Sequence, residues 1–290
     1  MKIDKIIFTC SEQFSPFWNL QSQIWKSKMG IEPTLLLFGK KSNTNVSEEF
    51  GRVVEVETDP TIPSILQVTM SKFLFPATDP NATWIIGDID MLPLQTNYFT
   101  KRIEEISSER NSYAHLNFCG ISQSMGVDPR VFFQRGGQTT GGVNLPGHYH
   151  IARGSVYGEL FSGGKTLSEV VRFVVDSKRY GMFDPAVQKY IGLDPTIHGS
   201  HWCAEEDYTS EVLATSIKEN KIQVHGVCYD NRNERIDRAV WNPKTKTYTF
   251  DPNRLIEGRY VDIHCHRPFH RSEEHTSELQ SRFGISYAVF

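Results

Sequence analysis

Residues Thr83-Trp84-Ile85-Ile86-Gly87-Asp88-Ile89-Asp90-Met91-Leu92-Pro93-Leu94 hold a short apolar run that leads into two carboxylates spaced by one residue. The run from Thr83 to Ile86 is β-favouring and follows the turn-forming Asp79-Pro80-Asn81, so we predict a buried central strand. Asp88 and Asp90 then fall where this strand ends. Ligands of open α/β sheets bind beyond the carboxyl ends of the strands. Two acids brought there need a positive partner, and a hard divalent cation that chelates a phosphorylated ligand suits them.

The residues before this strand predict an alternation of strands and helices. Its order, β-α-β-β-α-β, is typical of a parallel, Rossmann-like sheet with right-handed crossovers. We therefore expect the α/β class, with a mostly parallel central sheet flanked by helices. The expected strands are Lys5 to Cys10, Thr34 to Phe38 and Val53 to Val56, and the expected helices are Pro16 to Met29 and Ile65 to Phe75, with Ser64 as a cap.

The second part of the chain gives weaker signals. Alternating charge predicts a solvated helix from Phe99 to Arg110, and apolar runs predict strands at Tyr113 to Phe118 and Ile222 to Val227. The charged stretch from Asn231 to Lys246 is typical of a surface hairpin or loop.

Composition narrows the class of partner. The 290 residues carry a net charge of −3, so no basic field for nucleic acid is expected. Five scattered cysteines without a Cys-x-x-Cys pair indicate reduced thiols and no zinc cluster. The first residues contain neither a signal peptide nor a membrane anchor, so we expect a cytoplasmic protein without a membrane span.

Asp88-Ile89-Asp90, placed after its apolar strand, resembles the metal-binding Asp-x-Asp motif of glycosyltransferases with the GT-A fold. The resemblance extends to the order and layout of the elements over most of the chain. It implies one GT-A-like domain over residues 1–270, with a nucleotide-binding half at 1–94 and an acceptor-binding and metal-completing half at 95–270. Without that context, a solvated turn with two acids is the alternative.

The resemblance also implies which residues meet the sugar donor. Thr9 and Ser11 would lie near the nucleotide, and Lys72 would reach a phosphate or the base from its helix. Asp88 would face the ribose or the metal, and Arg267 would meet the diphosphate with its planar donor fork. The alternatives are ordinary hydroxyls at a strand end and a solvated lysine.

Two histidines and an aromatic residue are the candidates for contact with the sugars. In Leu145–Ser155, His148 and His150 share one face if the segment is a strand, and Ser155 would cap a helix from Val156 to Leu160. A strand and helix at this place hold donor sugar and acceptor in GT-A enzymes, and Trp202 is assigned the same role. The alternative for each histidine is a polar residue at a strand edge.

Glu205-Glu206-Asp207 is a second concentration of acids. Together with Trp202 it resembles the Trp-Gly-x-Glu-Asp segment of inverting GT-A enzymes, in which an acid near a helix start is the general base. The flexible glycine is replaced here and one Glu is additional, so the identity of the base stays open among the three. The alternative is that these acids stabilise the N-terminus of a helix.

Val261-Asp262-Ile263-His264-Cys265-His266 is the last candidate segment. A strand would place His264 and His266 on one face, and many GT-A enzymes complete the metal site with a late histidine. Either histidine fits, with Asp262 as its hydrogen-bond partner. The expected metal ligands are therefore Asp88, Asp90 and one of these histidines, and the expected cofactor is Mn²⁺ or Mg²⁺.

These observations predict a metal-dependent glycosyltransferase that moves a sugar from a nucleotide-diphosphate donor to a hydroxyl of a carbohydrate or glycan acceptor. The Glu-Glu-Asp segment favours inversion. One alternative is a haloacid-dehalogenase-like phosphatase, which carries Asp-x-Asp on its first strand and a Thr where this chain has Leu92. Another is a catalytically silent module that binds nucleotide sugars.

The last residues differ in kind from the rest. Arg271 to Ser281 and Ile285 to Phe290 resemble the in-frame translation of a sequencing adapter. We therefore treat 271–290 as a non-native tail, exclude it from the fold and the function, and expect the natural C-terminus to be missing beyond about His270.

Overall fold

A computed structural model of the chain describes residues 1–116, 147–177, 204–227, 234–237, 241–242, 247–248 and 250–265. Trp202, His266, Arg267 and the segment 271–290 lie outside the described residues, so the predictions made for them stay predictions.

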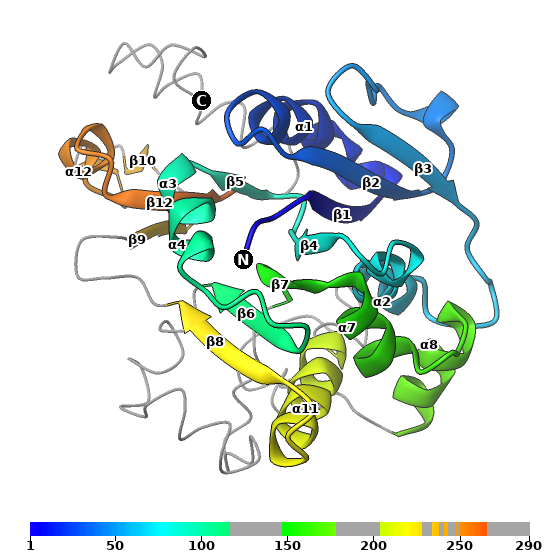
Figure 1. The fold of residues 1–290 in the computed structure, drawn as a ribbon. Helices are drawn as coiled ribbons and strands as arrows, with labels where there is room; N and C mark the ends of the chain where they lie inside the picture. The colour runs from blue at the N-terminus through cyan, green and yellow to red at the C-terminus, as the bar shows by residue number, and fades with distance from the viewer. Residues whose placement is uncertain are drawn as a thin grey trace.

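A seven-stranded sheet in the order β3-β2-β1-β4-β7-β6-β8 forms the centre of the fold (Figure 1). Its strand pairs are parallel except those of β7, which runs antiparallel to both β4 and β6. The predicted mostly parallel α/β sheet is thus confirmed. The strands are β1 (Lys5–Ser11), β2 (Glu32–Phe38), β3 (Arg52–Val56), β4 (Thr83–Ile86), β6 (Ser112–Leu116), β7 (His150–Arg153) and β8 (Gln223–Val227).

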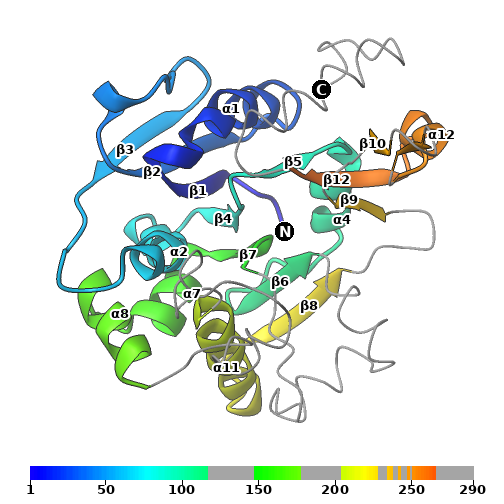
Figure 2. The same ribbon diagram turned by 180° about the vertical axis from the view of Figure 1, so that it is seen from behind.

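Helices cover both faces of this sheet. Figures 1 and 2 show α1 on one side and the group α2, α7, α8 and α11 on the other. The helices are α1 (Trp18–Ser27) after the 3₁₀ segment Glu12–Phe17, α2 (Ser64–Leu74), α3 (Thr96–Phe99), α4 (Lys101–Glu104), α7 (Gly154–Tyr157) with the π-helical Gly158–Ser162, α8 (Leu167–Asp176), α11 (Ala204–Lys218) and α12 (Pro252–Ile256).

The two-sided cover explains why the central strands are apolar without alternation. In β1, Ile6 and Phe8 belong to the cluster under α1, whereas Ile7 belongs to the cluster under α2. All three are fully buried because successive side chains point to opposite faces of a strand. β4 follows the same rule, since Ile85 packs on one side and Trp84 on the other.

A second, three-stranded sheet in the order β5-β12-β9 lies beside the first (Figure 2). β5 (Met91–Pro93) pairs antiparallel with β12 (Tyr260–His264), which pairs parallel with β9 (Glu234–Asp237). A short antiparallel pair joins β10 (Trp241–Asn242) to β11 (Thr247–Tyr248). The small sheet places late residues of the chain against the segment that follows β4.

The predicted solvated helix from Phe99 to Arg110 is wrong. Two four-residue helices, α3 and α4, occupy part of this stretch and meet at Thr100. Tyr98, Phe99 and Ile103 are at most 2% exposed and belong to the core cluster under α1. Packing of these apolar side chains overrides the pattern of charge that suggested a solvated helix.

Two predicted helix caps are also wrong. Ser64 is the first residue of α2, where Pro63 takes the N-cap position without a side-chain hydrogen bond. Ser155 lies inside α7, which begins one residue earlier, at Gly154. The first residue of α7 must be a glycine, because a Cβ atom at position 154 would lie 2.2 Å from the carbonyl oxygens of both Pro76 and Asp79.

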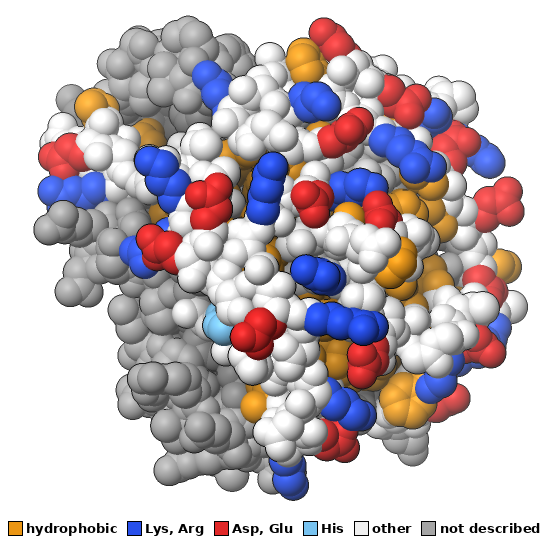
Figure 3. All heavy atoms as spheres, viewed as in Figure 1, with side chains coloured by type: hydrophobic (Ala, Val, Ile, Leu, Met, Phe, Trp, Pro, Cys, Tyr) orange, Lys and Arg blue, Asp and Glu red, His pale blue; other side chains and the backbone are white. Residues whose placement is uncertain are grey.

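The surface view shows acidic and basic side chains interspersed over one face (Figure 3). On this face, neither sign of charge dominates among the described residues. Among the described residues, no helix combines the length and the apolar character that crossing a bilayer requires.

The close packing at Gly154 gives a test of the fold. Gly154→Ala is expected to lower the free energy of unfolding by about 1–3 kcal/mol, because backbone atoms must move to accept the methyl group. Chemical denaturation measures this. Ser155→Ala in the same helix is the control and should change stability by less than about 0.5 kcal/mol. Equal effects of the two substitutions would contradict the packing at Gly154.

Candidate active site

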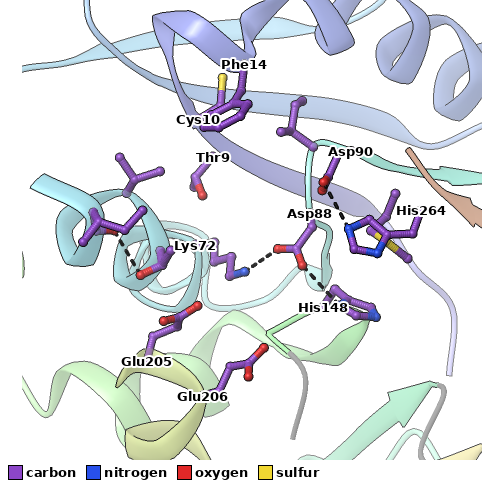
Figure 4. A pocket seen from close by; sticks show the side chains of 15 residues that line it. Thr9, Cys10, Phe14, Lys72, Asp88, Asp90, His148, Glu205, Glu206 and His264 are labelled. Carbon is purple, nitrogen blue, oxygen red and sulfur yellow. Dashed lines mark hydrogen bonds and ion pairs between the residues drawn. The ribbon is translucent and has the colours of Figure 1, made fainter. Parts of the chain in front are cut away.

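A pocket opens at the carboxyl ends of β1 and β4, between α2 and the start of α11 (Figure 4). This is the position predicted for ligand binding in an open α/β sheet. Most of the predicted site residues with described side chains line it. The lining consists of Thr9, Cys10, Phe14, Ile65, Val68, Thr69, Lys72, Asp88, Ile89, Asp90, Met91, His148, Glu205, Glu206 and His264.

Asp90 and His264 meet because β5 and β12 are paired. Met91 stands opposite His264 in this antiparallel pair, and the amide of Cys265 donates to the carbonyl oxygen of Asp90 at 2.8 Å. The His264 Nε2 atom lies 3.2 Å from Asp90 Oδ2. Asp90 is 1% exposed, so this carboxylate sits at the buried end of the pocket.

This pair has the chemistry and spacing of two neighbouring ligands of one cation. Ligand atoms about 2.1 Å from a metal and at right angles to each other are roughly 3.0 Å apart. The described residues contain no group of three His, Cys, Asp or Glu side chains placed to hold a metal. A cation here would therefore draw further ligands from water or from oxygens of a bound substrate.

Asp88 is held from two sides by charged and polar groups. Lys72 Nζ donates to its Oδ1 at 2.5 Å, and His148 Nδ1 lies 3.1 Å from its Oδ2. Burial opposes its charge, but the Lys72 ammonium and the His148 hydrogen bond hold the pKa of Asp88 well below its usual range. Asp88 is therefore ionised in the folded protein.

Lys72 is not the solvated lysine of the alternative interpretation. It is 3% exposed and points from α2 into the pocket (Figure 4). Burial disfavours its charge, but the carboxylates of Asp88 and Glu205 outweigh burial and raise the pKa of Lys72 above its ordinary value. Gly147 leaves room for this ammonium, since a Cβ atom there would lie 2.9 Å from Nζ.

Glu205 and Glu206 enter the pocket from the first turn of α11 (Figure 4). Burial raises the pKa of Glu205, although Lys72 opposes that effect. Burial and the neighbouring Glu205 raise the pKa of Glu206 to about 8, and its Oε1 accepts from the Gly147 amide at 3.0 Å. Two acids that share a buried place cannot both ionise easily, so this pair holds a proton near neutral pH. Asp207 lies on the same helix, but its side chain is outside the described residues.

His148 and His150 do not share a face, so that prediction is wrong. Tyr149 adopts a φ of 54°, and β7 begins only at His150. His148 lines the pocket, whereas His150 is fully buried between the rings of Phe73 and His115 and hydrogen-bonds the Tyr113 hydroxyl at 2.8 Å. The backbone turn at Tyr149 sends the two imidazoles to different places.

The first strand contributes less than predicted. Thr9 lines the pocket, but Ser11, at the end of β1, is not among the lining residues. Cys10 does line it, and burial raises the pKa of its thiol to about 12. A thiol with this pKa is not a nucleophile at neutral pH.

Sequence reasoning missed Arg235, which lies in the stretch interpreted as a charged surface loop. It belongs to β9 and forms a two-point ion pair with Asp262, with its Nε 2.7 Å from Oδ1 and a terminal nitrogen 2.8 Å from Oδ2. The same terminal nitrogen is 3.0 Å from His148 Nε2. Asp262, which we expected beside a metal-binding histidine, is instead the partner of Arg235. No local pattern distinguishes Arg235 from its charged neighbours.

Comparison with solved structures finds distant similarities to glycosyltransferases. No family model matches the chain, and no curated protein matches it. The galactosyltransferase LgtC, solved with donor and acceptor sugar analogues, is 11% identical over 98% of both chains, with a TM-score of 0.44. The bifunctional glycosyltransferase WbbM is 9% identical over 91% of this chain and 45% of its own, with a TM-score of 0.47. The glycosyltransferase GlyE of Streptococcus pneumoniae TIGR4 is 9% identical over 78% of this chain and 45% of its own, with a TM-score of 0.38.

The raised pKa of Glu206 predicts a pH dependence of stability. Between pH 4.5 and about 8, folded Glu206 keeps a proton that the unfolded chain releases, so the free energy of unfolding falls as the pH rises. Glu206→Gln keeps the acceptor for the Gly147 amide but has no proton to lose. Urea denaturation across this range should show a flatter pH profile for the variant than for the wild type.

Glu159→Gln is the matched control, because Glu159 is an exposed glutamate outside the pocket. Its profile should follow that of the wild type. If Glu206→Gln also followed it, Glu206 would have an ordinary pKa and the assignment of a buried, proton-sharing pair would be wrong.

Proposed function

We propose that the protein is a metal-dependent glycosyltransferase that moves a sugar from a nucleotide-diphosphate donor to an acceptor hydroxyl. The observation that carries the proposal is the composition of one pocket. The proposed metal ligands Asp90 and His264 lie in it together with the proton-sharing acids Glu205 and Glu206. A transferase of this kind needs both a site for the diphosphate and a site for proton transfer.

Asp90 and His264 are the residues that would hold the cation, which we propose to be Mn²⁺ or Mg²⁺. When bound, the ion would neutralise the charge that develops on the departing nucleoside diphosphate. Lys72 points toward the same region, so we propose that its ammonium meets a phosphate oxygen. Both oxygens of Asp88 already face Lys72 and His148, and we therefore assign Asp88 to the ribose side of the donor.

The opposite side of the pocket suits the base of the nucleotide. Phe14, Ile65 and Val68 contribute apolar surface to the lining, and Thr9 contributes a hydroxyl. A flat base with polar edges binds to such a combination of apolar wall and a few polar groups. Ser11 and Arg267 remain proposed donor contacts on the resemblance alone.

We propose that one of the acids at the start of α11 is the general base that accepts the proton of the acceptor hydroxyl. A general base works best when its pKa lies near the working pH, and Glu206 has a pKa of about 8. The Lys72 charge stabilises the ionised form of Glu205, so one acid of the pair can release its proton while the other retains it. Inversion at the sugar carbon, with Trp202 and His148 on the acceptor side, is part of the proposal.

Asp90→Asn should abolish metal-stimulated turnover, because the amide oxygen is a far weaker ligand than a carboxylate oxygen. Release of nucleoside diphosphate from a panel of nucleotide sugars, with and without manganese, measures this. Asp176→Asn, at the exposed end of α8, is the control and should keep full activity. Unchanged metal stimulation in a folded Asp90→Asn protein would exclude the metal site.

Single substitution of Glu205, Glu206 and Asp207 by the matching amides identifies the base. One variant should lose turnover about 100-fold or more while its affinity for the donor changes little, since general base catalysis contributes roughly 10²–10⁴-fold. Steady-state kinetics and donor titration separate the two effects. Three small and equal losses of turnover would indicate that these acids only stabilise the N-terminus of α11.

The same panel separates this proposal from the two alternatives. Release of inorganic phosphate from phosphomonoesters would support a phosphatase. Binding of nucleotide sugars, measured by thermal shift, without any turnover would support a catalytically silent module. Asp-x-Asp follows the fourth strand of the chain rather than the first, which argues against the phosphatase.

A further inference from the structure

A continuous set of charged and polar side chains joins the small sheet to the pocket. It runs from Asp262 through Arg235 and His148 to Asp88 and then to Lys72. Each successive pair is within 3.1 Å, and the side chains come from β12, β9, the segment before β7, the segment after β4, and α2. Arg235 and Asp262 are the members of this set that the proposed reaction does not use.

The position of Arg235 is itself fixed by strand pairing. Arg235 stands directly opposite Asp262 in the β9–β12 register. Asp262 is fully buried, and the two hydrogen bonds between its carboxylate and the planar guanidinium define the orientation of the arginine. The terminal nitrogen of Arg235 is thereby directed at His148 with little rotational freedom.

The contacts with Arg235 and Asp88 together determine which nitrogen of His148 carries the proton. An arginine nitrogen only donates hydrogen bonds, so His148 Nε2, at 3.0 Å from it, must be the unprotonated acceptor. The proton of the neutral ring is then on Nδ1, which lies 3.1 Å from Asp88 Oδ2 and donates to it. The tautomer of a histidine is commonly set in this way by the bond that its other nitrogen makes.

We propose that Arg235 is a positioning residue that holds His148 as the Nδ1–H tautomer and so fixes the carboxylate of Asp88 in the pocket. Asp88 then has a defined donor at each oxygen, His148 on one side and Lys72 on the other. Without Arg235, His148 Nε2 loses its donor, and the contact with Asp88 alone is left to define the tautomer of the ring. The effect on turnover rests on the proposed transferase function, whereas the tautomer does not.

Nitrogen NMR of histidine-labelled protein tests the tautomer directly. His148→Asn identifies the ring signals of His148 among the ten histidines. The wild type should show a protonated Nδ1 and an unprotonated Nε2. A protonated Nε2 in the wild type would overturn the proposal.

The variant that tests Arg235 must not leave Asp262 as an unpaired buried charge. Arg235→Met combined with Asp262→Asn removes both charges at nearly constant volume. In this folded double variant, the His148 Nε2 signal should move away from the position of an unprotonated acceptor. Retention of the wild-type signal would show that Arg235 does not set the tautomer. Asp262→Asn alone keeps Arg235 and one oxygen acceptor for it, so the His148 Nε2 signal should change less than in the double variant. An equally large change would contradict the role of Arg235 as the donor to His148.

Kinetics give a second, separate readout. Asn places an N–H group near the position of Nδ1, whereas Gln places its polar end near Nε2. His148→Asn should therefore retain turnover at least about tenfold better than His148→Gln, the value of a hydrogen bond to a charged group. Equal activities would overturn the link from His148 to Asp88. If no preparation transfers sugar but the NMR result is as expected, the proposed function fails and the positioning role of Arg235 stands.

Discussion

The site depends on one short antiparallel pairing, that of β5 with β12. β5 follows directly on the two aspartates, and β12 comes from near the end of the described chain. These few backbone hydrogen bonds hold His264 next to Asp90. The same small sheet places Arg235 beside Asp262, so one element positions both the candidate metal ligands and the polar residues behind them. A pairing of this length is stable only because Val261 and Met91 are buried in the core under α1.

The pocket holds several buried charges, and each is stabilised by a neighbour of opposite sign. Asp88 is ionised because Lys72 is beside it, and Lys72 stays charged because Asp88 and Glu205 are near. For Glu206, burial and the neighbouring Glu205 outweigh the Lys72 charge and raise the pKa to about 8. Removal of one charge would therefore shift the protonation of the others, and single substitutions here report on the group rather than on one residue.

The sequence was sufficient for the strand before Asp88 and for the α/β class, because an uninterrupted apolar run followed by acids has few other structural explanations. It also brought Lys72, His264, Glu205 and Glu206 into one site, although only through a resemblance to a family. It failed where long-range packing decides. The stretch after Phe99 carries charges of a solvated helix but is anchored by buried aromatic side chains, and the turn at Tyr149 separates two histidines that alternation would place together. The role of Arg235 could not be predicted because its partner, Asp262, is distant in sequence.

Gly147 carries a consequence for the redesign of this pocket. A methyl group there would press on the Lys72 ammonium, the free end of a flexible side chain, and not on the backbone. The protein would accommodate the change by moving that ammonium, so the cost would fall on the ion pair with Asp88 and not on the fold. Position 147 is thus a place where a small change in volume retunes the electrostatic balance of the cavity, which makes it a natural first choice for altering selectivity among ligands of different charge.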